Sequence, residues 1–170
     1  DKGKAIMTYP DGRVYEGDWE KLGPRGKGIS TFPDGHVYEG DHDDTIDEVF
    51  HGKGKMKYPD DRVYEGDWKH GNHDGKGVLT YPDGRICKGD FKNGLPSGMV
   101  HVEYPNGRVY DGSFKDGNAH GKGKMRDDDG SVYDGDWVNG TDKGKCEFWF
   151  TDGRFYRGDW KGTPHGRGTM

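Results

Sequence analysis

The residue types that could carry chemistry in this 170-residue chain are its eight histidines, its two cysteines and a group of acidic side chains. His51, His120 and His165 each stand directly before a glycine, and imidazole is a common zinc ligand. These histidines recur at wide intervals, so we expect them to lie too far apart to share one zinc ion within the chain. We therefore predict no bound metal within one chain, and a zinc site shared between two chains stays open.

The segment 117–123, Gly-Asn-Ala-His-Gly-Lys-Gly, has the general look of a phosphate-binding loop. Its glycine spacing is one residue short and no Ser or Thr follows the lysine, so the sequence lacks the groups of a P-loop. No Ser/His/Asp or Cys/His set stands out as a nucleophile with its base. We predict no catalytic residue, no cofactor and no enzyme activity in these residues.

Acidic residues gather between positions 41 and 48. Carboxylates suit hard cations such as calcium, but this segment lacks the glycine and the spacing of a calcium loop. A solvated insertion loop is the simpler interpretation, and binding of a cation or a basic partner is the alternative. Insertions in repeat proteins often map to a binding face, so we keep the insertion as a candidate site. Its residues are Asp43, Asp44, Asp47 and Glu48.

One unit recurs along the whole chain, and residues 52–68, GKGKMKYPDDRVYEGDW, are a representative copy. The period is 23 residues, with one spacing of 26. A fixed period of this size indicates a repeat array. We expect a single array over residues 1–170, with repeats starting near residues 3, 26, 52, 75, 98, 121 and 144 and a partial eighth from 166. The position of Tyr64 is filled in the other copies by Tyr15, Tyr38, Cys87, Tyr110, Tyr133 and Tyr156.

Each unit predicts a β-hairpin, because Tyr-Pro-Asp-Gly-Arg is hairpin-turn chemistry. Placing Tyr58 opposite Arg62 puts aromatic residues and glycines on one face and charged pairs such as Lys53 and Asp67 on the other. On the first face Gly54 then meets Gly66, where a ring of a neighbouring repeat can lie against the backbone. The Lys–Asp pair recurs at Lys4/Asp18, Lys27/Asp41, Lys76/Asp90, Lys122/Asp136 and Lys145/Asp159.

Composition limits the partner classes. Only 28% of the residues are hydrophobic, but 32 glycines and the aromatic residues recur in phase, which predicts a thin aromatic core spread along a solenoid. The formal net charge of −5 provides no strong basic field, so nucleic acid is not expected as a partner. No apolar run approaches the roughly 20 residues that a membrane-spanning helix needs.

The two cysteines are Cys87 and Cys146, about 2.5 repeats apart. Two strands per repeat at a strand spacing of about 4.8 Å separate them by on the order of 25 Å. A disulfide needs Cα atoms within about 7 Å, so we predict free thiols and a reducing compartment. Cys87 takes the place of a repeat tyrosine, and a small buried hydrophobic residue explains it better than a reactive thiol does.

Tyr-x-Gly-Asp-Trp, His-Gly-x-Gly and Tyr-Pro-Asp-Gly together resemble the MORN (membrane occupation and recognition nexus) repeat. Residues 15–19, 64–68 and 120–123 carry the resemblance, and seven in-phase copies extend it over essentially the whole chain. The resemblance implies an all-β fold, an elongated, solenoid-like, twisted antiparallel sheet of consecutive β-hairpins. It also implies a scaffold in the cytoplasm, at the cytoskeleton or at the cytoplasmic face of a membrane.

The first functional hypothesis is a non-catalytic scaffold that binds protein partners along a grooved aromatic face, with self-association through the array ends. The alternatives are a module that binds acidic phospholipids such as phosphoinositides, and an accessory region of a larger enzyme such as a lysine methyltransferase or a lipid kinase. Aromatic and arginine side chains are the usual anchors of an interface. The candidate partner-binding residues are Arg62, Tyr64, Trp68, Arg85, Phe91, Arg108, Tyr110, Phe114, Trp149 and Phe155.

Two of these candidates stand apart from the repeat pattern. In the predicted register Trp149 pairs with Phe155 on the face that is otherwise charged. An exposed aromatic pair marks a contact site, and local packing is the equal alternative. For Tyr64 and Trp68 a role in holding the fold is the stronger interpretation.

Overall fold

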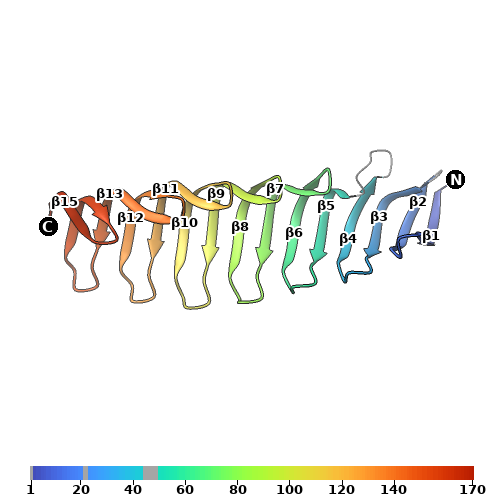
Figure 1. Ribbon diagram of the computed structural model, residues 1–170, viewed down its shortest axis with the longest axis horizontal. Coiled ribbons are helices and arrows are strands. Elements are labelled where there is room, and N and C mark those ends of the chain that lie inside the picture. The colour runs from blue at the N-terminus through green and yellow to red at the C-terminus, as the bar shows by residue number, and fades with distance from the viewer. Residues whose placement is uncertain (1, 21–22, 44–49) are drawn as a thin grey trace. The chain divides into compact units, whose positions relative to one another are not determined.

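The computed structural model describes residues 2–20, 23–43 and 50–170 and consists of β-strands joined by turns (Figure 1). In the described residues no helix is long and apolar enough to cross a membrane. The prediction of an all-β fold made of consecutive antiparallel hairpins is confirmed. The strands are β1 (Lys2–Thr8), β2 (Val14–Glu20), β3 (Gly23–Thr31), β4 (Val37–Asp43), β5 (Phe50–Lys57), β6 (Val63–Lys69), β7 (Asn72–Thr80), β8 (Ile86–Lys92), β9 (Leu95–Glu103), β10 (Val109–Lys115), β11 (Asn118–Arg126), β12 (Val132–Val138), β13 (Thr141–Trp149), β14 (Phe155–Lys161) and β15 (Pro164–Thr169).

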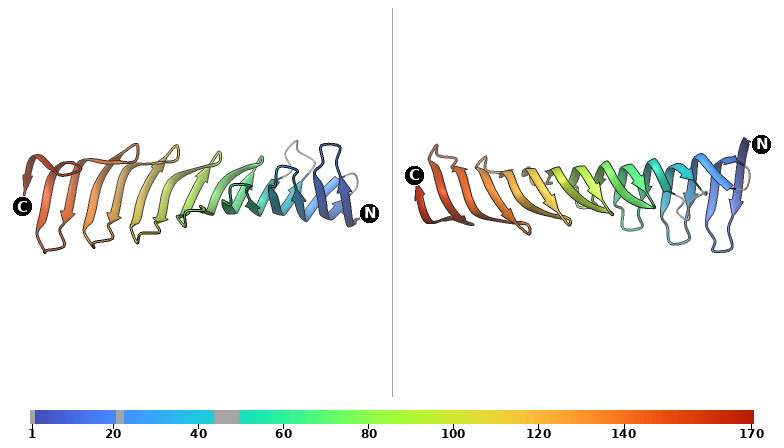
Figure 2. Two further views of the ribbon diagram at one scale, coloured as in Figure 1. Left: turned by 60° about the horizontal axis from the view of Figure 1, so that its bottom comes forward. Right: turned by 90° about the horizontal axis from the view of Figure 1, so that it is seen from above.

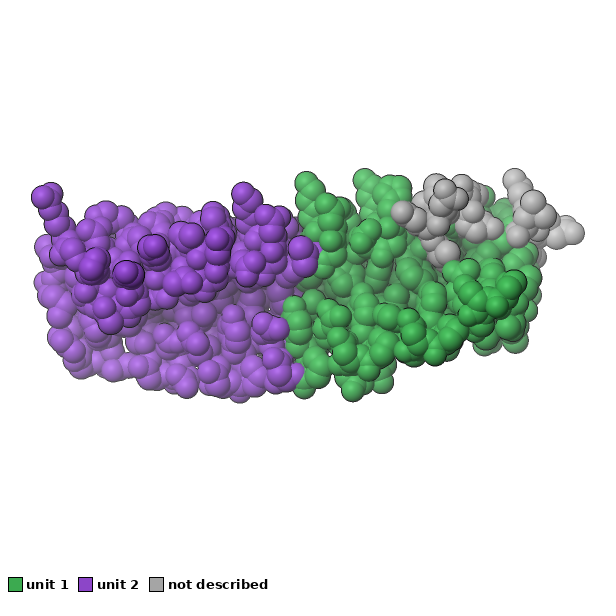
Figure 3. Space-filling model, in the orientation of Figure 1, with its two compact units in different colours: residues 1–82, 91–94 green, residues 83–90, 95–170 purple. Residues whose placement is uncertain are grey.

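The chain divides into two compact units (Figure 3). Unit 1 comprises residues 1–82 and 91–94, and unit 2 comprises residues 83–90 and 95–170. In unit 1 the strands β1 to β7 pair antiparallel in chain order, and in unit 2 the strands β9 to β15 do the same. Each unit is a single twisted layer of strands (Figure 2). The expectation of one array over residues 1–170 stays a prediction.

The register of the hairpins follows the prediction. Gly54 is opposite Gly66 and Lys53 is opposite Asp67 in the β5–β6 pair. The backbone N–H of Tyr58 donates to the carbonyl of Arg62 at 2.9 Å and closes the turn. Asp61, which replaces the turn glycine of the other repeats, has a φ of 63°, a conformation that Asp tolerates better than most residues. The turn chemistry therefore sets the pairing.

A second kind of turn joins one repeat to the next. Asn93-Gly94 has φ values of 49° and 82°, and Asn139-Gly140 has 49° and 80°. Two successive residues with positive φ make the two-residue turn that Asn-Gly favours, and its twist matches that of the flanking strands. These Asn-Gly pairs were available as a sequence signal for the connections between repeats.

The core of each unit consists of the repeat tyrosines packed over glycine. Tyr38, Tyr64 and Tyr110 are at most 1% exposed. A Cβ added at Gly54 would lie 2.5 Å from Cε2 of Tyr38, a ring of the preceding repeat. The Tyr64 hydroxyl donates to the carbonyl of Asp67 at 3.0 Å, so the buried oxygen has a partner. The predicted packing of rings on bare backbone is confirmed.

Candidate interaction surfaces

The motif aspartates tie one hairpin to the next. Asp67 accepts an ion pair from Lys53 Nζ at 2.5 Å and the backbone N–H of Lys76 at 2.8 Å. The second bond crosses a bulge in which Gly75 has a φ of 113°. Hydrogen bonding from Lys53, and then from the Lys76 amide, lowers the pKa of Asp67. The Asp67 carboxylate therefore holds three neighbouring strands together.

Asp67→Ala is expected to destabilise the chain by about 1–2 kcal/mol, because it leaves the Lys76 N–H without its acceptor and removes an ion pair. Urea unfolding followed by circular dichroism measures the change. Glu65→Ala is the matched control on the same strand, since its exposed contact with Lys55 Nζ is 3.7 Å long and should change stability by less than about 0.5 kcal/mol. Equal effects of the two variants would contradict the structural role of Asp67.

Four of the candidate partner-binding residues lie in the core. Tyr64 is 0% exposed, Tyr110 is 1% exposed, and Trp68 and Phe91 are 3% exposed. The Trp68 indole N–H donates to the carbonyl of Gly54 at 3.0 Å. Their positions fit the interpretation that they hold the fold, and partner contact through them stays a prediction.

The arginines that follow the hairpin turns form what we call the arginine rim. Three of them stack on the aromatic residue four positions earlier, at the start of the turn: Arg13 on Tyr9, Arg62 on Tyr58 and Arg154 on Phe150, with Arg62 Cζ 5.0 Å from the Tyr58 ring centre. The Arg62 guanidinium also donates to Asp60 at 2.7 Å. The sequence reasoning missed these aromatic partners, although Tyr and Arg recur four residues apart in the turn motif. The rim consists of Arg13, Arg62, Arg85, Arg108 and Arg154.

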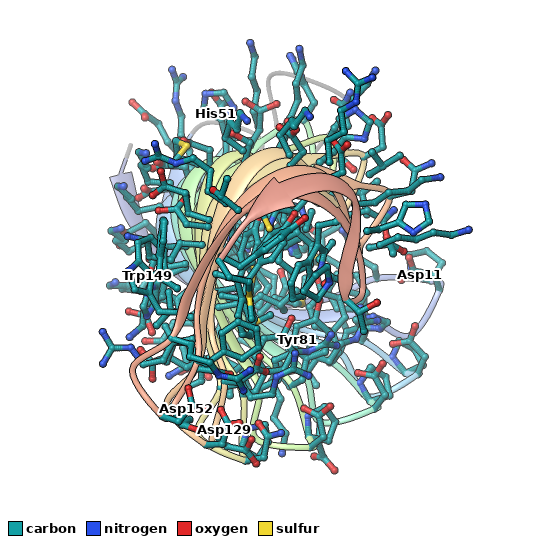
Figure 4. The ribbon with its side chains drawn as sticks, turned by 90° about the vertical axis from the view of Figure 1, so that its left-hand side faces the viewer. Asp11, His51, Tyr81, Asp129, Trp149 and Asp152 are labelled. Atoms are coloured by element: carbon teal, nitrogen blue, oxygen red, sulfur yellow. The ribbon has the colours of Figure 1, made fainter. Side chains whose placement is uncertain are left out.

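The rim in unit 2 is partly neutralised by carboxylates. Arg108 Nε lies 2.6 Å from an oxygen of Asp127, which takes the position of the repeat aromatic, and Arg154 Nε donates to Asp152 at 2.7 Å. Arg108 is half-buried and Arg154 is exposed. Phe114, a candidate residue of the inner face, is half-buried and lies 5.5 Å from the Tyr110 ring. The side chains of this face gather inside the curve of the ribbon (Figure 4).

Three apolar residues line up across the outer face of unit 2. Val132, Trp149 and Phe155 are register neighbours on β12, β13 and β14, and we call them the aromatic strip. Trp149 is 37% exposed and points away from the interior of the ribbon (Figure 4). Its ring centre lies 5.3 Å from that of Phe155, so the predicted outer-face pair is formed.

Cationic side chains border the aromatic strip. Arg126 on β11 pairs in register with Val132, and its exposed side chain has no carboxylate partner in the described part of the chain. At the other end, Arg157 Cζ lies 5.8 Å from the Phe155 ring centre and its guanidinium is paired with Glu147. Sequence reasoning missed Val132 and Arg126, because only the strand order places the β11–β12 hairpin beside β13, which carries Trp149.

The acidic insertion is largely outside the described residues, which include only Asp43 of the four candidates. Asp43 ends β4, opposite Arg25 in register, and is half-buried. Asp44, Asp47 and Glu48 lie outside the described residues. In the described ranges no group of three or more His, Cys, Asp or Glu side chains is placed to hold a metal ion.

Both cysteines are free, as predicted, and both are buried, as predicted for Cys87. Burial raises the pKa of the Cys87 thiol and of the Cys146 thiol to about 11. Such thiols remain protonated at neutral pH, and the thiolate is the reactive form. Cys87 therefore acts as a small core residue.

Fold and repeat pattern together define a β-hairpin repeat protein. A family model described as the MORN repeat matches residues 15–37, 49–61, 64–84, 87–99, 110–132, 133–153 and 156–170. The chain belongs to the MORN repeat family. A search of curated proteins returned no match.

Comparison with solved structures gives matches of low sequence identity. The wild-type TCP10 domain of Danio rerio CPAP matches with a TM-score of 0.53 and 19% identity, over 99% of this chain and 82% of that chain. The SAS-4 (dCPAP) TCP domain of Drosophila melanogaster, in complex with a proline-rich motif of Ana2 (dSTIL), matches with a TM-score of 0.49 and 17% identity, over 91% and 77%.

Proposed function

We propose that this chain is a non-catalytic scaffold that binds protein partners, with the aromatic strip of unit 2 as its main contact surface. Trp149 carries the proposal, because it is an exposed tryptophan on a face of unit 2 that also bears ion pairs such as Lys124–Asp134 and Lys145–Asp159. The corresponding positions of the other repeats hold Thr8, Thr31, Lys57, Thr80, Glu103 and Arg126. The hairpin therefore does not need an aromatic residue there, whereas tryptophan and arginine are enriched among the residues that dominate binding energy.

The bordering charges suggest the chemistry of the partner. Arg126, which has no carboxylate partner among the described residues, is the register neighbour of Val132, and Val132 is the register neighbour of Trp149. A partner that places an apolar side chain on the strip and a carboxylate on Arg126 would satisfy both groups. The half-exposed rim arginines of unit 2, Arg85 and Arg108, provide a second contact surface in this proposal.

Acidic phospholipid is the less favoured ligand. Arg108 and Arg154 already face carboxylates, and the outer-face lysines Lys122 and Lys145 are paired with aspartates. A phosphate would have to compete with these contacts, each basic residue contributing only about 1 kcal/mol at a charged membrane surface. We propose a cytoplasmic location at the cytoskeleton or at the cytoplasmic face of a membrane, which the identity of the captured partner would test.

Quantitative affinity capture from a lysate tests the proposal. A partner retained by the wild-type chain should be lost, or bound at least about tenfold more weakly, when Trp149→Lys and Phe155→Lys are combined. Ile6→Lys with Ile29→Lys is the matched control, because both isoleucines are exposed outer-face residues of unit 1, and it should keep the partner. Retention of every partner by the strip variant would overturn the strip as the contact surface.

Two further experiments distinguish protein binding at the arginine rim from phospholipid binding. Arg85→Glu with Arg108→Glu should weaken a partner that also uses the rim. Flotation with phosphoinositide-containing vesicles in a salt series tests the lipid alternative. Salt-sensitive flotation that the same arginine variant abolishes would replace the protein-scaffold proposal with a phospholipid-binding module.

A further inference from the structure

Two histidines occupy core positions in unit 1. His42 is 2% exposed and His73 is 7% exposed. His42 replaces the Trp or Phe that the other repeats carry at this position, as at Trp68 and Phe91. His73 fills a position that holds Phe50 in the preceding repeat. In unit 2, whose residues are all described, no histidine is buried.

His42 is bound as a neutral ring. Its Nδ1 lies 3.0 Å from the carbonyl of Gly40, and its Nε2 lies 2.9 Å from the hydroxyl of Ser30. This arrangement suits Nδ1–H as donor and Nε2 as acceptor. The ring contacts Tyr15 and Tyr38 edge to face, with centres 4.9 Å and 5.1 Å away. A second ring proton would face the Ser30 hydroxyl, which offers no charge to balance it.

His73 is held more tightly still. Its ring is stacked on Tyr64, with ring centres 3.5 Å apart and planes at 10°. Nε2 lies 2.6 Å from the Tyr58 hydroxyl, and the buried Nδ1 has no hydrogen-bond partner in the described residues. Trp68 and Phe91 meet the ring edge to face. A charge on this ring would be enclosed by aromatic side chains.

The charged groups around the two rings do not compensate for protonation. Near His42, Asp41 favours the cation and Arg13 opposes it. The Asp41 carboxylate is already bound to Lys27 Nζ and to the Lys53 amide, both at 2.8 Å. Near His73 the backbone of Gly94 favours the cation, and the charge of Arg62 opposes it. Burial lowers the pKa of His42, and it lowers the pKa of His73 to about 4.

We propose that His42 and His73 make unit 1 an acid-sensitive part of the chain. Protonation of the two histidines between pH 6.5 and pH 4.5 opens the packing of these rings with the aromatic side chains of β3–β7, while unit 2 stays folded. In this range an unfolded histidine binds a proton that the folded core excludes. Stability is therefore complete above pH 6.5 and falls as the pH falls. For His73 alone, pKa values of 6.5 unfolded and about 4 folded lower the folded-to-unfolded ratio about 70-fold at pH 4.5.

Hydrogen exchange of the full chain at pH 7.5 and pH 4.5, corrected for intrinsic rates and read by mass spectrometry, tests the proposal. Protection of β3–β7 should fall at least about tenfold more than protection of β11–β14. The motif aspartates occur in both units, so their titration affects both and cancels in this comparison. Equal loss of protection in the two units would overturn the proposal without the need for any variant.

Two variants test whether the buried histidines cause the loss of protection at pH 4.5. His42→Phe with His73→Phe should remove most of the excess exchange at pH 4.5, because each introduced side chain already occurs at the same position in another repeat. His70→Asn is the matched control, since His70 is an exposed histidine of the same unit at a turn position that is Asn93 and Asn139 elsewhere. If the control flattened the pH profile, or the double variant kept it, the buried histidines would not be its cause.

Discussion

Gly123→Val is expected to destabilise the chain by about 3 kcal/mol or more. A Cβ at Gly123 would lie 2.6 Å from Cζ of Tyr110, closer than side chains approach one another. The ring would have to leave a position in which it is 1% exposed, and its hydroxyl would lose the carbonyl of Ser113 at 3.1 Å. Displacing a well-packed aromatic side chain costs several kcal/mol.

Urea unfolding measures this change, with Gly3→Ala as the control. Gly3 also lies in a strand, but a Cβ there would meet nothing within 4 Å, so its substitution should change stability by less than about 0.5 kcal/mol. Cys146 shows that the same position of another repeat accepts an unbranched side chain next to Tyr133. Gly123→Cys should therefore cost less than Gly123→Val, and equal costs would contradict a steric origin.

The hairpin register was predictable because a wrong register would break the pattern of paired residues that recurs in the sequence. A shift of one residue would move every Lys–Asp pair and every aromatic residue to the opposite face. The same logic found the pair of Trp149 and Phe155, which are joined by one turn. The exchange of Lys and Asp for Met99 and Ser113 also fits, since these two face each other in β9 and β10.

The accessible surface was less predictable, for a physical reason. A repeat pattern shows which positions face inward, but burial depends on the side chains that fill the neighbouring positions. The Phe50 ring centre lies 3.9 Å from that of Tyr38 and His73 stacks on Tyr64, whereas one equivalent position in unit 2 holds Ala119. Contacts between residues of different hairpins, such as Val132 with Trp149, require the order of strands from several repeats.

Two positions that depart from the repeat pattern together show which side chains share one space in the core. Cys87 replaces the repeat tyrosine, and Val100 replaces the glycine on which that tyrosine would lie. Both are 3% exposed, so the smaller side chain at one position is matched by a larger one at the other. A Cβ at Gly89 would lie 2.9 Å from Cα of Val100, just as one at Gly112 would approach Cα of Gly123. Val100 therefore occupies the equivalent position across the strand pair.

Cys87→Tyr is therefore expected to destabilise the chain by about 2–3 kcal/mol, because the added ring would need the space that Val100 fills. Combined with Val100→Gly, the same change should recover at least half of the lost stability, since it recreates the tyrosine–glycine packing of the other repeats. A double-mutant cycle in urea unfolding measures the coupling, which should be about 1.5 kcal/mol or more in favour of the pair.

The matched control combines Cys87→Tyr with Val102→Ala, a neighbour on β9 that is equally buried and lies outside the glycine position. Additive costs in the Cys87/Val100 pair would show that the two positions do not share one space, and the packing of rings on glycine would then not explain why they differ together.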